Sequence, residues 1–433
     1  MENARPAPAR RLVDRFRAGV IASIDAGSFL TRCWERFHHI RGGRGMDRHP
    51  IRAIVFALAV IALFVVNGES TGEDLVHLST PPRAVSSILL EASTGQVLYE
   101  RDADLPRPPA SIAKLMLELI VLEKVEQGAI RLDSPITVSA WASKLGGSQV
   151  YLAHGEVFPL EDLLKAIVIS SANDACVAVA ERIAGSAEGF VDLMNLRARD
   201  LGLENTHYIN VHGLDDEPGR GNVTTARDIA LVARELVRHP DVLRLSKIEE
   251  APFRDGEFLL QNTNKLVGRF AGLDGLKTGY TRKAGFCLCA TAERNGLRLI
   301  SVILGADSNR LRFDETARLL GAGFAQLRME TVVAEGDSLP GTVPVIDGRT
   351  RTVEAVAAER IAVVLQERDE APAAVLVPRP ALRAPIARGD TVGTIEVRMP
   401  DGKVRRAAAL SAADVPEATI FQRIGRFFGG SGE

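Results

Sequence analysis

The chain has 433 residues, enough for two or three domains, and its 46% hydrophobic and 25% charged residues are typical of globular proteins. The net charge of −2 and the 5% aromatic content offer neither a basic nor a stacking surface for nucleic acid. The four cysteines, Cys33, Cys176, Cys287 and Cys289, form neither a disulfide framework nor a zinc motif, and we interpret the last two as buried free thiols. We therefore expect no nucleic-acid partner, no metal site and no cofactor.

The N-terminal part has the pattern of an export signal. Residues 1–52 carry eleven arginines against five acidic residues, and an apolar run of fourteen residues, Ala53–Val66, follows. This run is short for a membrane span and fits the core of a signal peptide. We interpret 1–45 as an upstream extension, 46–68 as the signal peptide and 69–84 as a polar linker. The alternative is a cytoplasmic arm with an uncleaved anchor; either way, the positive flank places the rest outside the cytoplasmic membrane.

A hairpin and a buried helix are expected next. The strand patterns Ser87–Glu91 and Gln96–Tyr99 flank a Ser-Thr-Gly turn and predict a β-hairpin. After Pro109, a run that is apolar on nearly every face leads to a glycine at position 128 and predicts a buried helix. Ser111 and Lys114 are three residues apart at its start, so their side chains leave the same face. A lysine of lowered pKa could activate this serine as a nucleophile; the alternative is a capping serine followed by a surface lysine.

The remaining pattern up to residue 328 predicts an α+β domain. Amphipathic segments predict helices at Leu160–Ile169, at Asp174–Ala184 with Asn173 or Asp174 as its N-cap, at Phe190–Leu201 and at about 314–327. Two strand patterns, Gly285–Ala292 and Leu297–Leu304, flank Asn-Gly, which is a type I′ turn signal. Strands at both ends with helices between them predict an antiparallel sheet with an inserted helical region.

Two further motifs follow Ser111 and Lys114. Ser171-Ala172-Asn173 begins 60 residues after Ser111, and Lys277-Thr278-Gly279 begins 106 residues later. S-x-x-K, S-x-N and K-T-G in this order are typical of penicillin-recognising serine enzymes. With surrounding segments such as "LGLENTHYINVHGLD" and "DGLKTGYT", residues from about 85 to 324 resemble the D-alanyl-D-alanine carboxypeptidases, which are low-molecular-mass penicillin-binding proteins. Ala172 departs from the family's usual glycine, and its methyl group is expected to narrow the site.

The resemblance implies a penicillin-binding or serine β-lactamase-like transpeptidase domain over 85–328 and an acyl-enzyme mechanism on peptidoglycan stem peptides. β-Lactam antibiotics would be trapped covalently on Ser111. The resemblance implies that Ser111 is the nucleophile and Lys114 the base. Ser171 would relay a proton, and Asn173 would hold Lys114 or donate to the substrate amide. The implied substrate-binding residues are Lys277, Thr278, Gly279, Tyr280 and Arg312. The backbones of Ser111 and Tyr280 would form the oxyanion hole. For Arg312 the alternative is a surface salt bridge.

Other functions stay open at this point. A DD-endopeptidase would use the same residues. A class A-like β-lactamase needs a glutamate for deacylation, but Thr206 stands at its position in "THYIN", which indicates slow deacylation. A non-catalytic wall-binding protein is disfavoured because the three motifs are intact.

The C-terminal part contains no catalytic motif. Short strand patterns predict a small all-β domain over 331–410, either a spacer and interaction module or a structural appendage. Residues 416–428 form an amphipathic helix pattern, with Ile420, Phe421, Ile424, Phe427 and Phe428 opposite Gln422, Arg423 and Arg426. Such a helix suits the surface of an anionic bilayer, and packing on its own domain is the alternative. We expect an extracytoplasmic, periplasmic enzyme in peripheral contact with the cytoplasmic membrane.

Overall fold

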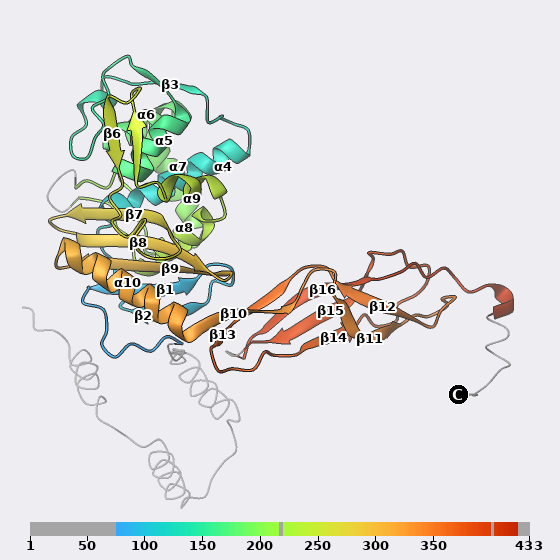
Figure 1. Ribbon diagram of the computed structural model, residues 1–433. Coiled ribbons are helices and arrows are strands. Elements are labelled where there is room, and N and C mark those ends of the chain that lie inside the picture. Colours follow the sequence, from blue (N-terminus) through green and yellow to red (C-terminus); the bar gives the residue numbers. More distant parts are fainter. Residues whose placement is uncertain (1–74, 216–219, 400–401, 423–433) are drawn as a thin grey trace, which may run out of the picture. The chain divides into compact units, whose positions relative to one another are not determined.

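The computed structural model describes residues 75–215, 220–399 and 402–422 (Figure 1). The predicted extension at 1–45, the predicted signal peptide at 46–68 and residues 423–428 of the predicted C-terminal helix lie outside the described residues. Among the helices that are described, none combines the length and the hydrophobicity needed to cross a membrane.

A five-stranded antiparallel sheet forms the centre of the catalytic domain, in the order β2-β1-β9-β8-β7. Its strands are β1 (Ser86–Glu91), β2 (Val97–Arg101), β7 (Leu273–Thr281), β8 (Gly285–Arg294) and β9 (Leu297–Ala306). Both predicted hairpins are confirmed, because β1 pairs with β2 and β8 pairs with β9. Asn295 and Gly296 join β8 to β9 with φ values of 50° and 77°, as a type I′ turn requires.

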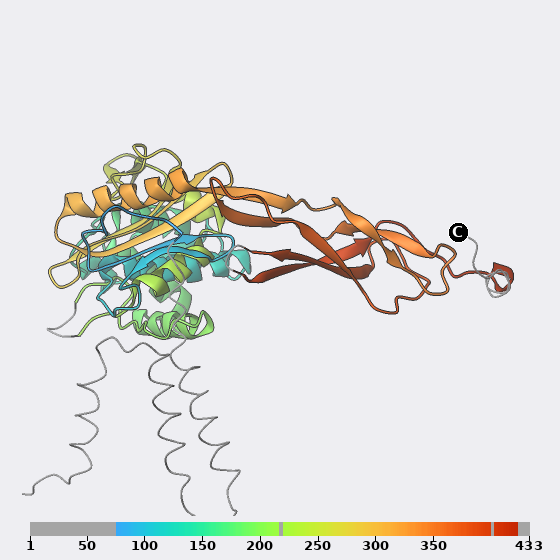
Figure 2. The same ribbon diagram turned by 90° about the horizontal axis from the view of Figure 1, so that it is seen from below.

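The helical region is inserted between β2 and β7, which confirms the α+β class. Its helices are η1 (Ala110–Ala113), α4 (Lys114–Glu126), η2 (Ala142–Lys144), α5 (Leu160–Ser170), α6 (Asn173–Ala184), α7 (Ala187–Asp200), α8 (Ala226–Leu236) and α9 (Pro240–Ser246). Two small antiparallel strand pairs complete it: β3 (Pro135–Thr137) with β4 (Val157–Pro159), and β5 (Glu250–Phe253) with β6 (Phe258–Gln261). The helical region packs on one face of the central sheet, and the helix α10 (Asn309–Gln326) covers the other face (Figure 2).

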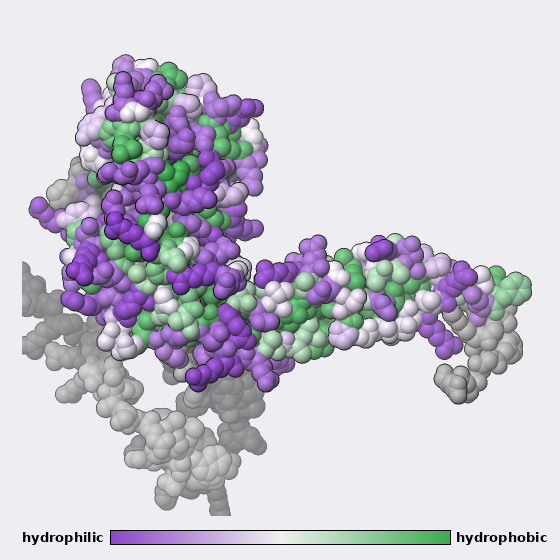
Figure 3. Space-filling view, in the orientation of Figure 1, coloured by the Kyte–Doolittle hydropathy of each residue, from purple (hydrophilic) through white to green (hydrophobic). Residues whose placement is uncertain are grey.

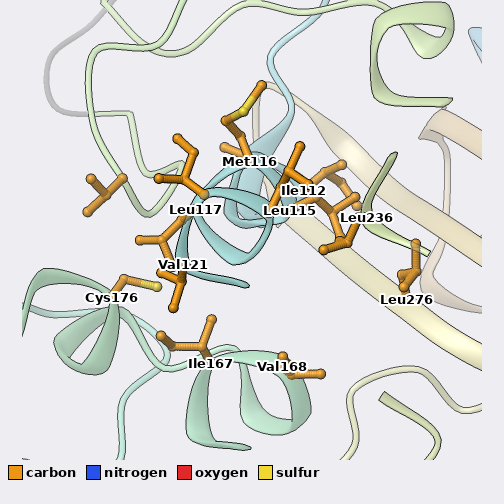
Figure 4. Close-up of a cluster of buried hydrophobic side chains, with 14 of the residues drawn as sticks. Ile112, Leu115, Met116, Leu117, Val121, Ile167, Val168, Cys176, Leu236 and Leu276 are labelled. Atoms are coloured by element: carbon orange, nitrogen blue, oxygen red, sulfur yellow. The ribbon is translucent and has the colours of Figure 1, made fainter. Parts of the chain in front are cut away.

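Helix α4 runs through the core of the helical region. Every residue from Lys114 to Leu122 is buried, as the apolar pattern predicted. Figure 4 shows its side chains together with those of α5, α6, α8 and β7. Each fully buried leucine or valine contributes about 1.5–3 kcal/mol relative to exposure. Because α4 is held on all sides, the residues at its N-terminus have fixed positions.

Three local expectations were wrong. The N-cap of α6 is Ala172, not Asn173 or Asp174, and the Asp174 carboxylate instead accepts the N–H groups of Val150 and Leu152, both at 3.1 Å. Helix α10 begins at Asn309, before the predicted start near 314, because Ser308 Oγ accepts the N–H of Leu311 at 3.1 Å as an N-cap.

The third difference is the stretch 75–84, expected as part of a linker. Val76 is fully buried, and its N–H donates to the Leu98 carbonyl at 2.9 Å. The His77 N–H donates to Gln326 Oε1 at 2.9 Å. This stretch is therefore packed against the catalytic domain. Its mostly polar sequence suggested a linker, but its few apolar side chains contact the hydrophobic core of that domain.

The β domain has its own hydrophobic core. It contains the strand pair β10 (Leu327–Val333) and β13 (Ile361–Gln366). Its five-stranded sheet has the order β11-β12-β16-β15-β14, with β11 (Ser338–Pro344), β12 (Thr352–Ala357), β14 (Ala374–Pro378), β15 (Thr391–Arg398) and β16 (Val404–Ser411). The alternation of buried and partly buried residues along β15 and β16 explains why the sequence pattern identified strands here.

Candidate active site

Ser111 and Lys114 meet at the N-terminus of α4. Ser111 lies in the 3₁₀ turn η1, and Lys114 is the first residue of α4. Lys114 Nζ lies 2.9 Å from Ser111 Oγ and donates to Asn173 Oδ1 at 2.8 Å and to the His212 carbonyl at 2.9 Å. Since a neutral amine has two N–H bonds and one lone pair, those two acceptors use both N–H bonds. The lone pair then faces the hydroxyl of Ser111, as proton abstraction requires.

Burial favours the neutral form of Lys114. The side chain is fully buried and makes no ion pair with a carboxylate of the described residues. Burial lowers the pKa of Lys114, and the more distant charges of Glu118 and Asp174 only partly oppose this. Lys114 therefore has both the position and the electrostatic environment of a general base.

The S-x-N residues lie where α5 ends and α6 begins. Ser171 caps α5 in the left-handed region, with φ 64° and ψ 30°, and it is 4% exposed. A serine seldom adopts this conformation, which turns the chain sharply enough to bring Asn173 to Lys114. The hydroxyl of Ser171 makes no hydrogen bond to another described residue, Ser111 included.

Asn173 also attaches a neighbouring loop to the site. Its Nδ2 donates to the Gly146 carbonyl at 2.8 Å, which fixes the amide so that Oδ1 faces Lys114. Its backbone N–H donates to the Ser148 carbonyl at 2.7 Å. With the bonds of Asp174 to Val150 and Leu152, the loop 146–152 is held beside the catalytic residues.

The K-T-G motif lies on β7, the edge strand of the central sheet. A Cβ on Gly279 would lie 2.8 Å from the Pro109 carbonyl oxygen and 3.1 Å from Ile112 Cγ1, so only glycine lets β7 approach η1 this closely. Thr278 Oγ1 is 2.8 Å from Thr263 Oγ1. Tyr280 is 55% exposed and stacks on Phe286. The outer edge of β7 has no strand partner among the described residues, so its backbone groups can bind an extended peptide.

Lys277 is the second buried lysine of the site. It is 1% exposed, and burial together with the charge of Lys114 lowers its pKa to about 7. The charge of Arg312 acts in the same direction, whereas that of Glu118 opposes it. Two lysines that disfavour each other's charge are expected to adopt different protonation states.

Arg312 lies on α10 behind the K-T-G strand. Its Nη1 donates to the Gly279 carbonyl at 2.9 Å and to the Cys287 carbonyl at 3.2 Å, and its Nη2 donates to Asn309 Oδ1 at 2.6 Å. The guanidinium also contacts the Phe286 ring. It is not the surface salt bridge considered as the alternative, because these partners are uncharged and the residue is 8% exposed. These three acceptors use three of the five N–H bonds of the guanidinium, and the buried Nε has no partner among the described residues.

Three further groups of the site give no signal in the sequence pattern. The His212 carbonyl accepts a hydrogen bond from Lys114. Every residue has a backbone carbonyl, so the residue type cannot predict this contact. Gly213 has φ 85°, and a Cβ there would lie 1.9 Å from the Ala110 carbonyl oxygen, so a glycine must stand beside the turn that carries Ser111. Glu118 is 2% exposed on α4, inside a run that otherwise reads as apolar core.

Three cysteines of the described residues, Cys176, Cys287 and Cys289, are buried and free, as expected for the last two. Within the described ranges, no group of three or more histidine, cysteine or acidic side chains is arranged to hold a metal ion.

Comparisons with known proteins place the chain in a family. The family model described as "D-alanyl-D-alanine carboxypeptidase" matches residues 77–308, and the model for "Penicillin-binding protein 5, C-terminal domain" matches residues 328–417. The chain is 32% identical to D-alanyl-D-alanine carboxypeptidase DacF of Bacillus subtilis, over 84% of this chain and 92% of the relative. It is 33% identical to D-alanyl-D-alanine carboxypeptidase DacC of Escherichia coli, over 87% and 95% respectively.

Solved structures show the same architecture. Penicillin-binding protein 5 from Haemophilus influenzae superposes with a TM-score of 0.67 at 28% identity, over 79% of this chain and 100% of that one. Penicillin-binding protein D2 from Listeria monocytogenes in its ampicillin-bound form superposes with a TM-score of 0.53 at 33% identity, over 57% of this chain and 100% of that one. The fold and the site are those of a serine-type penicillin-binding enzyme. The chain belongs to the D-alanyl-D-alanine carboxypeptidase family.

Proposed function

We propose that this enzyme removes the terminal D-alanine from peptidoglycan stem peptides through an acyl-enzyme on Ser111. The observation that carries the proposal is the 2.9 Å separation of Lys114 Nζ from Ser111 Oγ, with both N–H bonds of Lys114 directed to other acceptors. This arrangement supplies an activated serine without a histidine.

In the acylation step, Lys114 takes the hydroxyl proton of Ser111 while Oγ attacks the penultimate carbonyl carbon. The backbone N–H groups of Ser111 and Tyr280 stabilise the oxyanion. The peptide C–N bond then breaks, and Ser171 relays the proton from Lys114 to the departing amine of D-alanine. In deacylation, water adds to the ester with Lys114 as base, and the shortened peptide leaves as a carboxylic acid.

Substrate binding is assigned to β7. Lys277 and Thr278 attract the terminal carboxylate of the substrate, and the peptide lies along the unpaired edge near Gly279 and Tyr280. Arg312 stabilises this strand by its hydrogen bond to the Gly279 carbonyl. Contact with the substrate carboxylate is its secondary role. β-Lactams would acylate the same serine, a proposal supported by the ampicillin-bound relative.

Slow deacylation of the β-lactam adduct separates this proposal from a β-lactamase. Thr206, at the position of the deacylating glutamate, donates its hydroxyl proton to Asp228 Oδ2 at 2.6 Å and so serves the local fold. The family and its named relatives favour a carboxypeptidase over an endopeptidase.

The test is release of D-alanine from a soluble pentapeptide ending in D-Ala-D-Ala, together with intact-mass analysis after exposure to benzylpenicillin. The full chain should release D-alanine and acquire one penicillin adduct. Ser111→Ala should do neither, because the proposed acyl bond forms on Ser111 Oγ. Release of D-alanine or an adduct in Ser111→Ala would place the nucleophile elsewhere.

We further propose that the enzyme is periplasmic and that its C-terminal helix contacts the cytoplasmic membrane. At the end of the described chain, Ile420 and Phe421 are 73% and 87% exposed, and Figure 3 shows hydrophobic surface there. A protein spanning 69–414 should keep its activity on soluble peptide but lose sedimentation with anionic vesicles, compared with one spanning 69–433. Equal sedimentation of the two would leave the helix without a membrane role.

A further inference from the structure

A buried carboxylate outside the three motifs lies beside the catalytic lysines. Glu118 follows Lys114 by four residues on α4, so the two side chains leave the helix on the same face. Its side chain is 2% exposed, and its Oε1 has no hydrogen-bond partner within the described part of the chain. An unpartnered buried carboxylate lowers stability, so the fold by itself does not account for a glutamate here.

The ionisable groups whose charges interact with that of Glu118 come from four elements. They are Lys114 on α4, Cys176 on α6, Lys277 on β7 and Cys289 on β8. Cys176 points toward α4 in Figure 4. Burial raises the pKa of the Cys176 thiol to about 12 and that of Cys289 further still, so both thiols stay neutral. Glu118 and the two lysines are therefore the groups of this cluster that exchange protons near neutral pH.

The charges just outside this cluster are already engaged. Asp174, which acts on Lys114, has its carboxylate bonded to the N–H groups of Val150 and Leu152. Arg312, which acts on Lys277, donates to backbone carbonyls. Of the described carboxylates that act on the two lysines, Glu118 is thus the one with an oxygen left unbonded.

We propose that Glu118 is a positioning residue for protons: its negative charge keeps Lys277 protonated while Lys114 stays neutral. The inference rests on the roles proposed above, which need an ammonium at Lys277 to attract a carboxylate and a free amine at Lys114 to act as base. Two buried ammonium groups repel each other, and two neutral amines would leave neither lysine as a cation for the substrate. One carboxylate whose charge acts on both lysines stabilises the state with a single buried positive charge.

The titration ranges agree with this assignment. Burial raises the pKa of Glu118 to about 7, against the opposing effect of the charges of Lys277 and Lys114. The pKa of Lys277 is lowered to about 7. Since the two groups titrate over the same range, the charge of one depends on that of the other.

The experiment is the pH dependence of acylation in Glu118→Gln. The second-order rate constant for a fluorescent penicillin, whose carboxylate stands in for that of the substrate, reports the ionisations of the free enzyme. Removing the negative charge disfavours ammonium groups, so the lysine pKa values should fall. The alkaline limb, where Lys277 loses its proton, should move by roughly one pH unit toward acid. Glu118→Asp, which keeps the charge, should return the limb toward its original position.

A matched control lies on the same helix. Glu123 accepts a bond from Arg197 and is remote from the lysines, so Glu123→Gln removes the same charge from α4 and should leave the profile unchanged. Glu118→Met, of similar volume, should shift the limb as Glu118→Gln does and unfold at the same or a higher temperature, because it removes an unsatisfied buried group.

Two outcomes would overturn the proposal. One is an unchanged alkaline limb in both Glu118→Gln and Glu118→Met; the other is a loss of thermal stability in Glu118→Met with no change of profile, which would mark a purely structural residue. Neither is confused with failure of the proposed function, which would appear as normal acylation in Ser111→Ala.

Discussion

The two domains of this chain treat buried polar groups in opposite ways. The core of the catalytic domain contains Lys114, Glu118, Lys277 and Arg312, each at most 8% exposed. From Leu327 to Ser411, the only described polar residue that is buried is Ser411. The core of the β domain is otherwise made of valine, isoleucine, leucine and alanine.

The difference separates residues kept for chemistry from residues kept for stability. A buried ionisable group costs free energy unless neighbours satisfy it, and Lys114 and Lys277 lie in a dry environment without an ion pair in the described structure. The same burial lowers the pKa of Lys114, which a lysine that acts as a general base requires. Between Leu327 and Ser411, the described part of the β domain contains no buried ionisable group. The predictions below test whether the two cores can be altered independently.

The largest effect is expected for Lys114→Arg. Arginine keeps the positive charge but stays protonated, so it cannot take the proton of Ser111. Acylation by penicillin should fall roughly 10²–10⁴-fold, the usual contribution of general base catalysis. Lys124→Arg, on the partly exposed C-terminal part of the same helix, is the control and should acylate normally. Near-normal acylation of a folded Lys114→Arg would remove Lys114 as the base.

A smaller effect is expected for Gly279→Ala. The added methyl group would lie 2.8 Å from the Pro109 carbonyl oxygen, so β7 must move away from the turn that carries Ser111. A shift of this kind should lower the acylation rate by up to about 10²-fold, through misplacement of the oxyanion donors. Gly321→Ala on α10, where a Cβ meets no atom within 4 Å, should leave the rate unchanged. Equal rates for the two variants would show that β7 and η1 can separate without consequence.

The smallest effect on catalysis is expected in the β domain. Ile395 is fully buried on β15, and Ile395→Ala should lower the free energy of unfolding of the β domain by about 2–5 kcal/mol. Val375→Ala, at a position 56% exposed, should change it by less than about 0.5 kcal/mol. Chemical denaturation measures the stability, and the acylation rate under native conditions should be unaffected in both. Slower acylation in a folded Ile395→Ala protein would mean that the β domain acts on the site.

Local patterns predicted most elements but not all of their ends. The hairpins, the buried helix α4 and the strands of the β domain follow from the spacing of apolar residues and turn signals. The caps of α6 and α10 could not be predicted in the same way. Asp174 is chemically a good N-cap, but it bonds a loop more than twenty residues earlier in the chain. Which backbone N–H groups a side-chain acceptor such as Asp174 binds depends on tertiary packing.

By itself, the sequence determined the α+β class, the family and the three motifs, because these depend on residue types at short range and in a fixed order. Only the tertiary structure decided the environment of the motifs. The His212 carbonyl and Asn173 orient the amine of Lys114, and Gly213 and Gly279 permit close approach to the turn of Ser111. The charge of the buried Glu118 acts on both lysines. The physical reason is that desolvation and charge depend on what the folded chain places around a group, and those neighbours are up to about 160 residues away from Lys114 in the sequence.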